Sequence, residues 1–341
     1  MKKKRPVLQD VADLVGVTKM TVSRYLRNPE QVSEALRGKI AVALDELGYI
    51  PNRAPDILSN ATSRAIGVLL PSEGNAFFDD VIHGMDRAAS SYVIYGLTVR
   101  YYSMKGYDVD KQLHLMEQMK GKVNALIISP IDDARIAKAI DALVDAGIFV
   151  VTIVNDIKSS KRHCYVGSDY FNGGETACAL LDALLGGKAK VGIVMGSRQV
   201  LGHCERLEGF RHRMEKAPGF SIVDIIENGD DEICSYERTK HLLDDHPDIS
   251  AMFLLAGGVY GACRAIMQLP EQERPLTIAF DSVPSTVEMM RKGIVKAILY
   301  QHPTRQGRMA ISIAFEYLVN GRMPDKKNYI MKNEIRLLEN L

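Results

Sequence analysis

From residue 62 onward, short continuous apolar runs alternate with amphipathic stretches, and this alternation constrains the fold more than any other feature. The runs expected as strands are residues 65–70, 125–129, 148–154, 190–195, 251–255, 276–280 and 295–300. The stretches expected as helices are residues 79–91, 111–119, 134–146, 173–185 and 209–216. Uninterrupted Val, Ile and Leu runs that alternate with helices are typical of parallel sheets covered on both faces. We therefore predict an α/β body of two doubly wound subdomains rather than one large sheet.

Composition and cysteine use point to a soluble cytoplasmic protein. The chain has 341 residues, 46% of them hydrophobic and 25% charged, which is ordinary for a globular protein. The longest apolar stretch, residues 146–154, is about half of the ~18–20 residues that a membrane helix needs. The basic N-terminus is not followed by the apolar segment of a signal peptide. The five cysteines form no CxxC pair and are expected to be free thiols.

The small net charge of +1 hides an uneven distribution along the chain. Residues 1–60 hold ten Lys and Arg against seven Asp and Glu, whereas the remainder holds 33 against 35. A small basic module on a slightly acidic body favours a nucleic-acid reader joined to a sensing domain. A basic tail on an ordinary enzyme would have the same charge balance.

The first fifty residues predict three short helices. The first helix carries the apolar stripe Leu8, Val11, Ala12 and Val15. Gly16 supplies the turn, Thr18 can cap the second helix, and Val22 and Leu26 face inward from it. The third helix begins after Ser33. Two short helices joined by a glycine-containing turn make a helix-turn-helix, although a three-helix protein-docking bundle would have a similar pattern.

The detailed order of residues separates these alternatives. The run is Asp10-Val11-Ala12, Gly16-Val17-Thr18, Thr21-Val22-Ser23-Arg24, Val32-Ser33, Arg37 and Leu47-Gly48-Tyr49-Ile50-Pro51-Asn52. In this order and spacing, residues 1–51 resemble the DNA-binding headpiece of the LacI/GalR family, especially that of gluconate-utilisation repressors. The resemblance implies that the second helix enters the major groove of double-stranded DNA.

The same resemblance implies roles for individual side chains. The implied DNA contacts are Thr18, Lys19, Met20, Thr21, Ser23, Arg24, Asn52 and Leu58. The base-reading positions among them are Lys19, Met20 and Arg24. Arg24 can donate two hydrogen bonds to a guanine, and Met20 can offer an apolar contact to a thymine methyl. The positions that fix register on phosphate are Thr21, Ser23 and Asn52.

Residues 52–61 match the family's hinge helix, which the resemblance expects to order when two subunits meet on DNA. Leu58 stands at the position of the apolar wedge that opens a minor-groove step. Pro55 and Asp56 depart from the family's usual sequence; Pro suits a first helical turn, but an acid beside phosphate is unfavourable. A simple linker remains the alternative for this segment.

Polar and aromatic side chains follow several of the predicted strands, where ligands bind in such folds. The candidates for effector binding are Asn75, Phe77, Phe78, Asp132, Arg206, Asp281 and Gln301. Together they suit a polyhydroxylated ligand, because planar donors and acceptors take hydroxyls and rings cover apolar sugar faces. Taken singly, an Asp is more often a helix cap and a Phe pair is more often core.

These motifs together resemble the effector domain of the same family, in the branch related to ribose-type periplasmic binding proteins. The resemblance makes residues 62–341 the effector-binding and dimerisation domain. It implies a first subdomain of about 62–164 plus 294–325 and a second of about 165–293 plus 326–341. Where most relatives have Asn-Asp after the strand ending near Leu255, this chain has Ala256-Gly257-Gly258-Val259-Tyr260. A usual sugar contact is therefore missing there, or is replaced by backbone or by Tyr260.

Catalytic and metal-binding patterns are absent from the sequence. It contains no GxxxxGK[ST], GxGxxG or GxSxG motif, and its histidines lack metal-ligand spacing. The adjacent pair Asp132-Asp133 does not suit a two-carboxylate mechanism, because neighbouring side chains diverge. We therefore expect no catalytic residue, no metal and no cofactor.

The sequence thus predicts a sequence-specific transcription regulator, a repressor of carbohydrate catabolism genes that a small sugar or sugar acid releases from DNA. A two-fold homodimer would read a pseudo-palindromic operator, and the lack of a C-terminal heptad segment favours a dimer over a tetramer. Three alternatives stay open. They are a regulator whose ligand promotes DNA binding, a sugar-handling enzyme with an appended headpiece, and a sugar receptor that no longer binds DNA.

Overall fold

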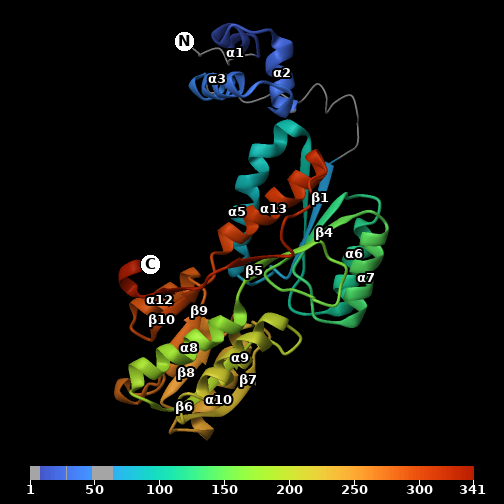
Figure 1. The fold of residues 1–341 in the computed structure, drawn as a ribbon. Helices are drawn as coiled ribbons and strands as arrows, with labels where there is room; N and C mark the ends of the chain where they lie inside the picture. Colours follow the sequence, from blue (N-terminus) through green and yellow to red (C-terminus); the bar gives the residue numbers. More distant parts are fainter. Residues whose placement is uncertain (1–7, 28, 48–63) are drawn as a thin grey trace, which may run out of the picture. The chain divides into compact units, whose positions relative to one another are not determined.

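The computed structural model describes residues 8–27, 29–47 and 64–341, and the protein consists of two compact units, Met1–Thr62 and Ser63–Leu341 (Figure 1). The predicted hinge at residues 52–61, with Asn52, Pro55, Asp56 and Leu58, lies outside the described residues. Each unit is described by itself below.

The headpiece forms the three predicted helices. They are α1 (Leu8–Val15), α2 (Lys19–Arg27) and α3 (Glu34–Glu46), with a 3-10 turn η1 (Pro29–Gln31) before α3. Gly16 adopts a φ of 72° between α1 and α2, and the Thr18 hydroxyl accepts a hydrogen bond from the Thr21 amide at 3.2 Å. The core of this small unit consists of Val11, Ala12, Val22, Val32, Ile40 and Ala43. The helix-turn-helix prediction is confirmed.

The body is built on two six-stranded sheets. The first has the strand order β11-β5-β4-β3-β1-β2 and is parallel throughout. Its strands are β1 (Arg64–Leu70), β2 (Leu97–Ser103), β3 (Ala125–Ile128), β4 (Phe149–Ile153), β5 (Cys164–Ser168) and β11 (Asn328–Met331). The order reverses between β1 and β3, so the crevice of this sheet opens at the carboxyl ends of those two strands.

The second sheet has the order β12-β10-β9-β8-β6-β7, with β12 antiparallel at its edge and the other strands parallel. Its strands are β6 (Lys188–Met195), β7 (Gly219–Glu227), β8 (Ala251–Leu254), β9 (Leu276–Phe280), β10 (Val295–Tyr300) and β12 (Glu334–Arg336). Here the order reverses between β6 and β8. The prediction of two doubly wound subdomains is confirmed.

Helices cover both faces of each sheet, as Figure 1 shows. The first sheet is flanked by α5 (Phe77–Tyr92) and α13 (Pro303–Asn320) on one face and by α6 (Val109–Met119) and α7 (Ala134–Asp145) on the other. The second is flanked by α8 (Tyr170–Leu185) and α9 (Leu201–Met214), and oppositely by α10 (Glu232–Asp245), α11 (Val259–Ile266) and α12 (Pro284–Arg291). Short 3-10 turns complete the body at η2 (Val93–Tyr95), η3 (Glu271–Glu273) and η4 (Leu338–Asn340).

The sheet topology corrects the predicted subdomain boundaries. β10 belongs to the second sheet, although the prediction assigns residues 294–325 whole to the first subdomain. β11 belongs to the first sheet, although the prediction assigns residues 326–341 to the second. β5 likewise extends the first sheet to Ser168, a few residues past the predicted boundary at 164. The predictions failed because an apolar run identifies a strand but not the sheet in which that strand finds its partner.

The polypeptide crosses between the subdomains three times, and these crossings are bonded to one another. They follow β5, β10 and β11. The Asn333 amide donates to the Asp169 carbonyl at 2.8 Å, and the buried Gln306 amide donates to the Gln301 carbonyl at 2.7 Å. The Ser168 hydroxyl donates to that same carbonyl at 3.3 Å. The two halves of the body are therefore joined at a compact set of connections beside the cavity described next.

Three further observations on the described part of the chain concern its cysteines, membrane-spanning helices and metal ligands. Its five cysteines are free thiols. Across residues 8–27, 29–47 and 64–341, no helix has the length and apolar character needed to cross a membrane. The same residues contain no group of three His, Cys, Asp or Glu side chains that could hold a metal ion.

Candidate functional site

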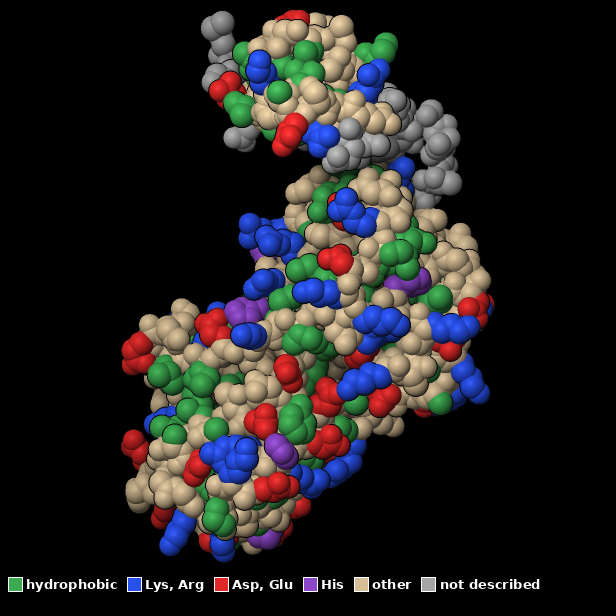
Figure 2. All heavy atoms as spheres, in the orientation of Figure 1, with side chains coloured by type: hydrophobic (Ala, Val, Ile, Leu, Met, Phe, Trp, Pro, Cys, Tyr) green, Lys and Arg blue, Asp and Glu red, His purple; other side chains and the backbone are tan. Residues whose placement is uncertain are grey.

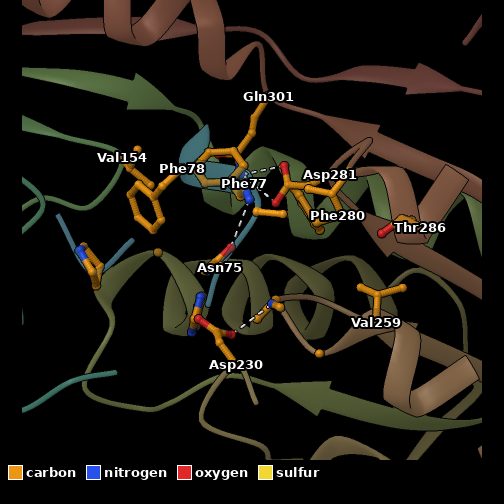
Figure 3. A pocket seen from close by; sticks show the side chains of 18 of the residues that line it. Asn75, Phe77, Phe78, Val154, Asp230, Val259, Phe280, Asp281, Thr286 and Gln301 are labelled. Atoms are coloured by element: carbon orange, nitrogen blue, oxygen red, sulfur yellow. Dashed lines mark hydrogen bonds between the residues drawn. The ribbon is translucent and has the colours of Figure 1, made fainter. Parts of the chain in front are cut away.

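A cavity of about 110 Å³ lies where the carboxyl ends of strands from both sheets meet, several times the space that one water needs (Figure 3). Six of the seven predicted effector-binding residues line it. They are Asn75, Phe77, Phe78, Arg206, Asp281 and Gln301. They come from the loop after β1 and the first turn of α5, from the ends of β9 and β10, and from α9, so the tertiary structure gathers side chains far apart in the sequence.

One wall carries a partly buried carboxylate paired with an amide. Asp281 follows β9 in a left-handed conformation with a φ of 69°, which turns the side chain off the strand direction. The Gln301 Nε2 donates to both Asp281 carboxylate oxygens, at 2.9 and 3.1 Å (Figure 3). Burial raises the pKa of Asp281 to about 6, although the Arg206 charge and the Gln301 hydrogen bond act in the opposite direction. The carboxylate is thus a partly buried acceptor that is largely ionised at neutral pH.

Arg206 lies deep in the cavity, with only 3% of its surface exposed. Its Nη1 donates to the Leu255 carbonyl at 2.5 Å. Its guanidinium carbon stands 3.8 Å from the centre of the Phe280 ring and 4.6 Å from that of the Tyr170 ring. Its Nε, also buried, has no hydrogen-bond partner among the described residues. The guanidinium is thus fixed on two aromatic faces and retains one donor without a partner among the described residues.

The aromatic side of the cavity begins at the first turn of α5. The Asn75 carboxamide oxygen accepts a hydrogen bond from the Phe77 amide at 3.1 Å, which fixes the loop before the helix (Figure 3). The Phe77 and Phe78 rings meet edge to face, with centroids 5.3 Å apart. Both rings line the cavity and also belong to the core of the first sheet. The pair therefore belongs to the core and lines the cavity at the same time.

Asp132 is the predicted residue that the structure does not bring into this cavity. Its side chain is exposed in the loop after β3, and its backbone amide donates to the Gln199 carbonyl at 3.1 Å. Gln199 lies in the loop after β6, so this hydrogen bond joins loops of the two subdomains. The neighbouring Asp133, rather than Asp132, caps α7 by accepting from the Arg135 amide at 2.8 Å.

Sequence reasoning missed Asp230, a lining residue that comes from the loop after β7. Its carboxylate accepts hydrogen bonds from the Gly257 amide at 2.9 Å and from the Tyr107 hydroxyl. Buried Asn228 positions this loop: its oxygen accepts from the Asp230 amide at 2.9 Å, and its amide nitrogen donates to the Gly257 carbonyl at 2.8 Å. Recognition of the less regular residues 219–227 as a strand would have placed Asp230 at a strand exit.

His203 and Tyr107 complete this part of the wall, and both are neutral at physiological pH. Burial lowers the pKa of His203 to about 4, although the Asp230 carboxylate acts in the opposite direction. The His203 Nδ1 accepts a hydrogen bond from the Ser197 amide at 3.2 Å, as a neutral ring does. Burial, with a further contribution from the Asp230 charge, raises the pKa of Tyr107 well above its ordinary value.

The described DNA-contact candidates of the headpiece lie on or next to α2. Lys19, Met20 and Arg24 are exposed, and Met20 keeps 71% of its surface open, which is unusual for so large an apolar side chain. Thr18 is exposed as well, while Thr21 and Ser23 are partly buried. The inward face of the same helix supplies Val22 to the core. One helix therefore anchors the unit on one side and presents polar groups and an apolar methionine on the other.

Comparison with known proteins decides the family. Residues 7–52 match the model of bacterial regulatory proteins of the lacI family, and residues 66–322 match that of a periplasmic binding protein domain. The chain is 39% identical over 277 residues to the HTH-type transcriptional regulator GntR of Escherichia coli K12, covering 80% of this chain and 81% of that protein. This chain belongs to the lacI family of transcriptional regulators.

Two sugar-binding proteins resemble the body. The ribose import binding protein RbsB of Bacillus subtilis is 27% identical over 272 residues, covering 77% of this chain and 85% of that protein. The crystal structure of GanP, a glucose-galactose binding protein from Geobacillus stearothermophilus, superposes with a TM-score of 0.75 at 25% identity, covering 82% of this chain and 99% of that one. The named relatives are regulators and binding proteins rather than enzymes.

Steric contacts favour glycine at Gly257 and Gly258, the positions where the sequence is expected to depart from the family pattern. A Cβ on Gly257 would lie 3.0 Å from the Asp230 Cβ, and one on Gly258 would lie 2.4 Å from the Asn228 Nδ2. Gly258 also has a φ of 79°, which side-chain-bearing residues rarely adopt. Backbone lines the cavity at both positions, and Tyr260 does not reach it. The space of the missing side chains is thus taken by the loop that carries Asp230.

Proposed function

We propose that this regulator is a repressor that works in the cytoplasm as a homodimer on a pseudo-palindromic operator and is released by a small carbohydrate. One observation carries the proposal: the chain that holds a lacI-type headpiece also holds a cavity lined by both subdomains at their strand ends. An effector that touches both subdomains binds one arrangement of the body better than another. Such a difference in affinity is what shifts a conformational equilibrium.

On the DNA side, the proposal assigns base reading to the exposed residues of α2. Arg24 would donate to a guanine, and Met20 would touch a thymine methyl. The phosphate contacts would come from Thr21, Ser23 and Asn52, with Leu58 as the minor-groove wedge. A two-fold dimer would place two such helices on matching half-sites.

On the effector side, the proposal assigns the polar groups of the cavity to sugar hydroxyls and its rings to the apolar sugar faces. Arg206 and Asn75 would donate hydrogen bonds, Asp281 would accept them, and Gln301 would hold Asp281 in place. The covering rings would be Phe77, Phe78 and Phe280. Asp132 remains a proposed contact at the edge of the site, since its loop is hydrogen-bonded to the loop after β6.

The first step of the test identifies the operator by selection from DNA duplexes of random sequence. Full-length protein is used to enrich duplexes from a randomised library. Binding of the most enriched duplex is then measured by fluorescence anisotropy. We expect an inverted repeat, and log-log salt dependence with a slope of about −0.9 for each phosphate contact. The titration is then repeated with pentoses, hexoses, polyols and sugar acids, each at a concentration that saturates any binding seen by calorimetry.

The outcomes separate the alternatives. Weaker operator binding with one sugar supports a repressor released by its effector, and tighter binding would reverse the sign of the response. Chemical conversion of a bound sugar would favour the enzyme alternative. Binding to all duplexes alike, with no enriched sequence, would contradict an operator-reading headpiece.

A further inference from the structure

The charges around the cavity are predominantly negative. Three of its lining side chains are carboxylates: Asp230, Glu232 and Asp281. Among the described residues that line it, Arg206 is the one cation at neutral pH, because His203 is held neutral by burial. On the visible face of the body, acidic and basic side chains are interspersed (Figure 2), so this local excess of acid is not a continuation of a uniformly acidic surface.

Arg206 does not cancel this excess. One of its nitrogens is already bonded to the Leu255 carbonyl, and its face is covered by Phe280 and Tyr170. Its charge also acts on Asp281, since it lowers the pKa that burial raises. A ligand carboxylate beside Arg206 would therefore share one guanidinium with the carboxylates already present.

Asp230 stands where it can meet a ligand. In Figure 3 it lies across the cavity from Asp281 and Gln301. Its two oxygens accept from Gly257 and Tyr107, which leaves further lone pairs on a carboxylate that can accept about four hydrogen bonds. Its charge is close enough to Asp281 to contribute to the raised pKa of that residue. The two carboxylates thus act on the same small space from opposite sides.

Two of the lining residues each contain a buried polar atom without a hydrogen-bond partner in the described part of the chain. The Arg206 Nε and the Gln301 Oε1 have no hydrogen bond among the described residues, and their side chains are 3% and 2% exposed. Buried polar groups are normally satisfied, and the hydroxyl groups of a ligand, which can donate and accept, would supply partners for both atoms.

We propose that Asp230 contacts the effector directly and, with Asp281 and Glu232, restricts it to uncharged sugars or polyols, so that sugar acids are rejected. The inference rests on the proposed function, since it names the class of carbohydrate that the same cavity binds. Hydroxyl groups donate to ionised carboxylates in strong, charge-assisted hydrogen bonds. A ligand carboxylate has no proton to donate and is repelled by like charges in a partly desolvated site.

The test compares neutral and acidic ligands of matched shape. The pairs are D-glucose with D-glucuronate, D-galactose with D-galacturonate, and the acyclic polyol D-glucitol with D-gluconate. Dissociation constants are measured by isothermal titration calorimetry on the full-length protein at pH 7.5. For each pair in which at least one member binds, we expect the neutral member to bind about tenfold tighter or more. This is the size of effect that like charges a few ångströms apart can produce.

The variant Asp230→Asn tests the residue itself. Asn tolerates the left-handed backbone of this position (φ 58°) and retains an acceptor for the Gly257 amide. We expect the ratio of acid to neutral dissociation constants to fall by about tenfold in this variant, because one of the like charges is gone. The matched control Asp224→Asn removes an exposed carboxylate from β7, outside the cavity, and leaves the ratio unchanged.

Failure of this inference can be told apart from failure of the proposed function. A sugar acid that binds as tightly as its neutral partner and releases the operator overturns the inference and leaves the sugar-responsive regulator standing. A ratio that does not move in a correctly folded Asp230→Asn variant removes Asp230 from the site. If no member of any pair binds, and the wider panel of pentoses, hexoses, polyols and sugar acids also has no effect on operator binding, the carbohydrate effector itself is wrong. The wild-type series identifies the ligand class even if a variant does not fold.

Discussion

Helix α2 of the headpiece and the cavity of the body hold their candidate residues in opposite physical environments. On α2, Arg24 and Met20 are exposed and stand outside the small core. In the cavity, Arg206 and Gln301 are almost fully buried. An exposed side chain can change without altering the fold, whereas a buried charge or amide depends on its neighbours and they on it. The two regions should therefore lose function in different ways.

The largest effect is expected for Arg206→Ala. Removal of one partner from a buried set of charges costs about 2–5 kcal/mol, so the dissociation constant of the tightest neutral sugar should rise at least ~thirtyfold. Operator binding without sugar should persist, because the headpiece is untouched. Calorimetry measures the sugar affinity, and fluorescence anisotropy measures operator binding. The control Arg211→Ala removes an exposed arginine from the same helix, and an unchanged sugar affinity in Arg206→Ala would exclude that residue from the site.

The next effect concerns the backbone of the cavity wall. Gly258→Ala places a Cβ 2.4 Å from the Asn228 Nδ2, whereas Gly147→Ala meets nothing within 4 Å at a similar φ of 83°. Both variants have the cost of a left-handed alanine, about 1–2 kcal/mol. Gly258→Ala should lose a further ~1–3 kcal/mol from overpacking. The free energies of unfolding of the two variants are compared by denaturant titration. Equal values would show that the loops after β7 and β8 are not tightly packed against each other.

Arg24→Ala should affect specificity and leave stability alone. The loss of a bidentate contact costs about 1–3 kcal/mol of discrimination at one base pair, while non-specific DNA binding stays nearly unchanged. Lys39→Ala, which removes an exposed positive charge from α3, is the control for charge alone. Anisotropy titrations on the selected operator and on single-base variants measure the difference. A uniform loss on all duplexes would assign Arg24 to phosphate instead.

The smallest effect is a difference in pH dependence. Asp281 has a pKa raised from 3.8 to about 6, so it holds a proton that the unfolded chain releases, and its contribution to stability falls as pH rises from 4 to 6. His203 has a pKa lowered from 6.5 to about 4, so its contribution rises with pH from 4 to 6.5. In the wild-type protein these trends oppose each other.

In the variant Asp281→Asn, the increase in stability with pH that His203 contributes should no longer be offset. The free energy of unfolding of this variant should rise more steeply with pH between 4 and 6 than that of the wild type, by at most about 1.4 kcal/mol per pH unit for one proton. Denaturant unfolding at half-unit pH steps measures the slopes, with Asp224→Asn as the control. Parallel curves for Asp281→Asn and wild type would mean that the Asp281 carboxyl titrates normally in the folded state.

Local patterns determined much of this protein by themselves. Apolar periodicity, the Gly16 turn and the Thr18 cap specify the headpiece, since each acts within a few residues of its own position. Continuous apolar runs likewise specified the central strands of both sheets, because a strand buried on both faces has no polar face. Strand exits then identified six residues of the cavity.

Tertiary structure decided the rest. The edge strands β2 and β7 are partly exposed and lack a continuous apolar run, so their ends, and with them Tyr107 and Asp230, were not anticipated. Sheet membership of β10 and β11 depends on which strands they meet, which no local pattern records. The space that Gly257 and Gly258 leave for the Asp230 loop arises between segments some thirty residues apart. Charge balance in the cavity is set by that packing, because burial and the distances between charged groups exist only in the folded protein.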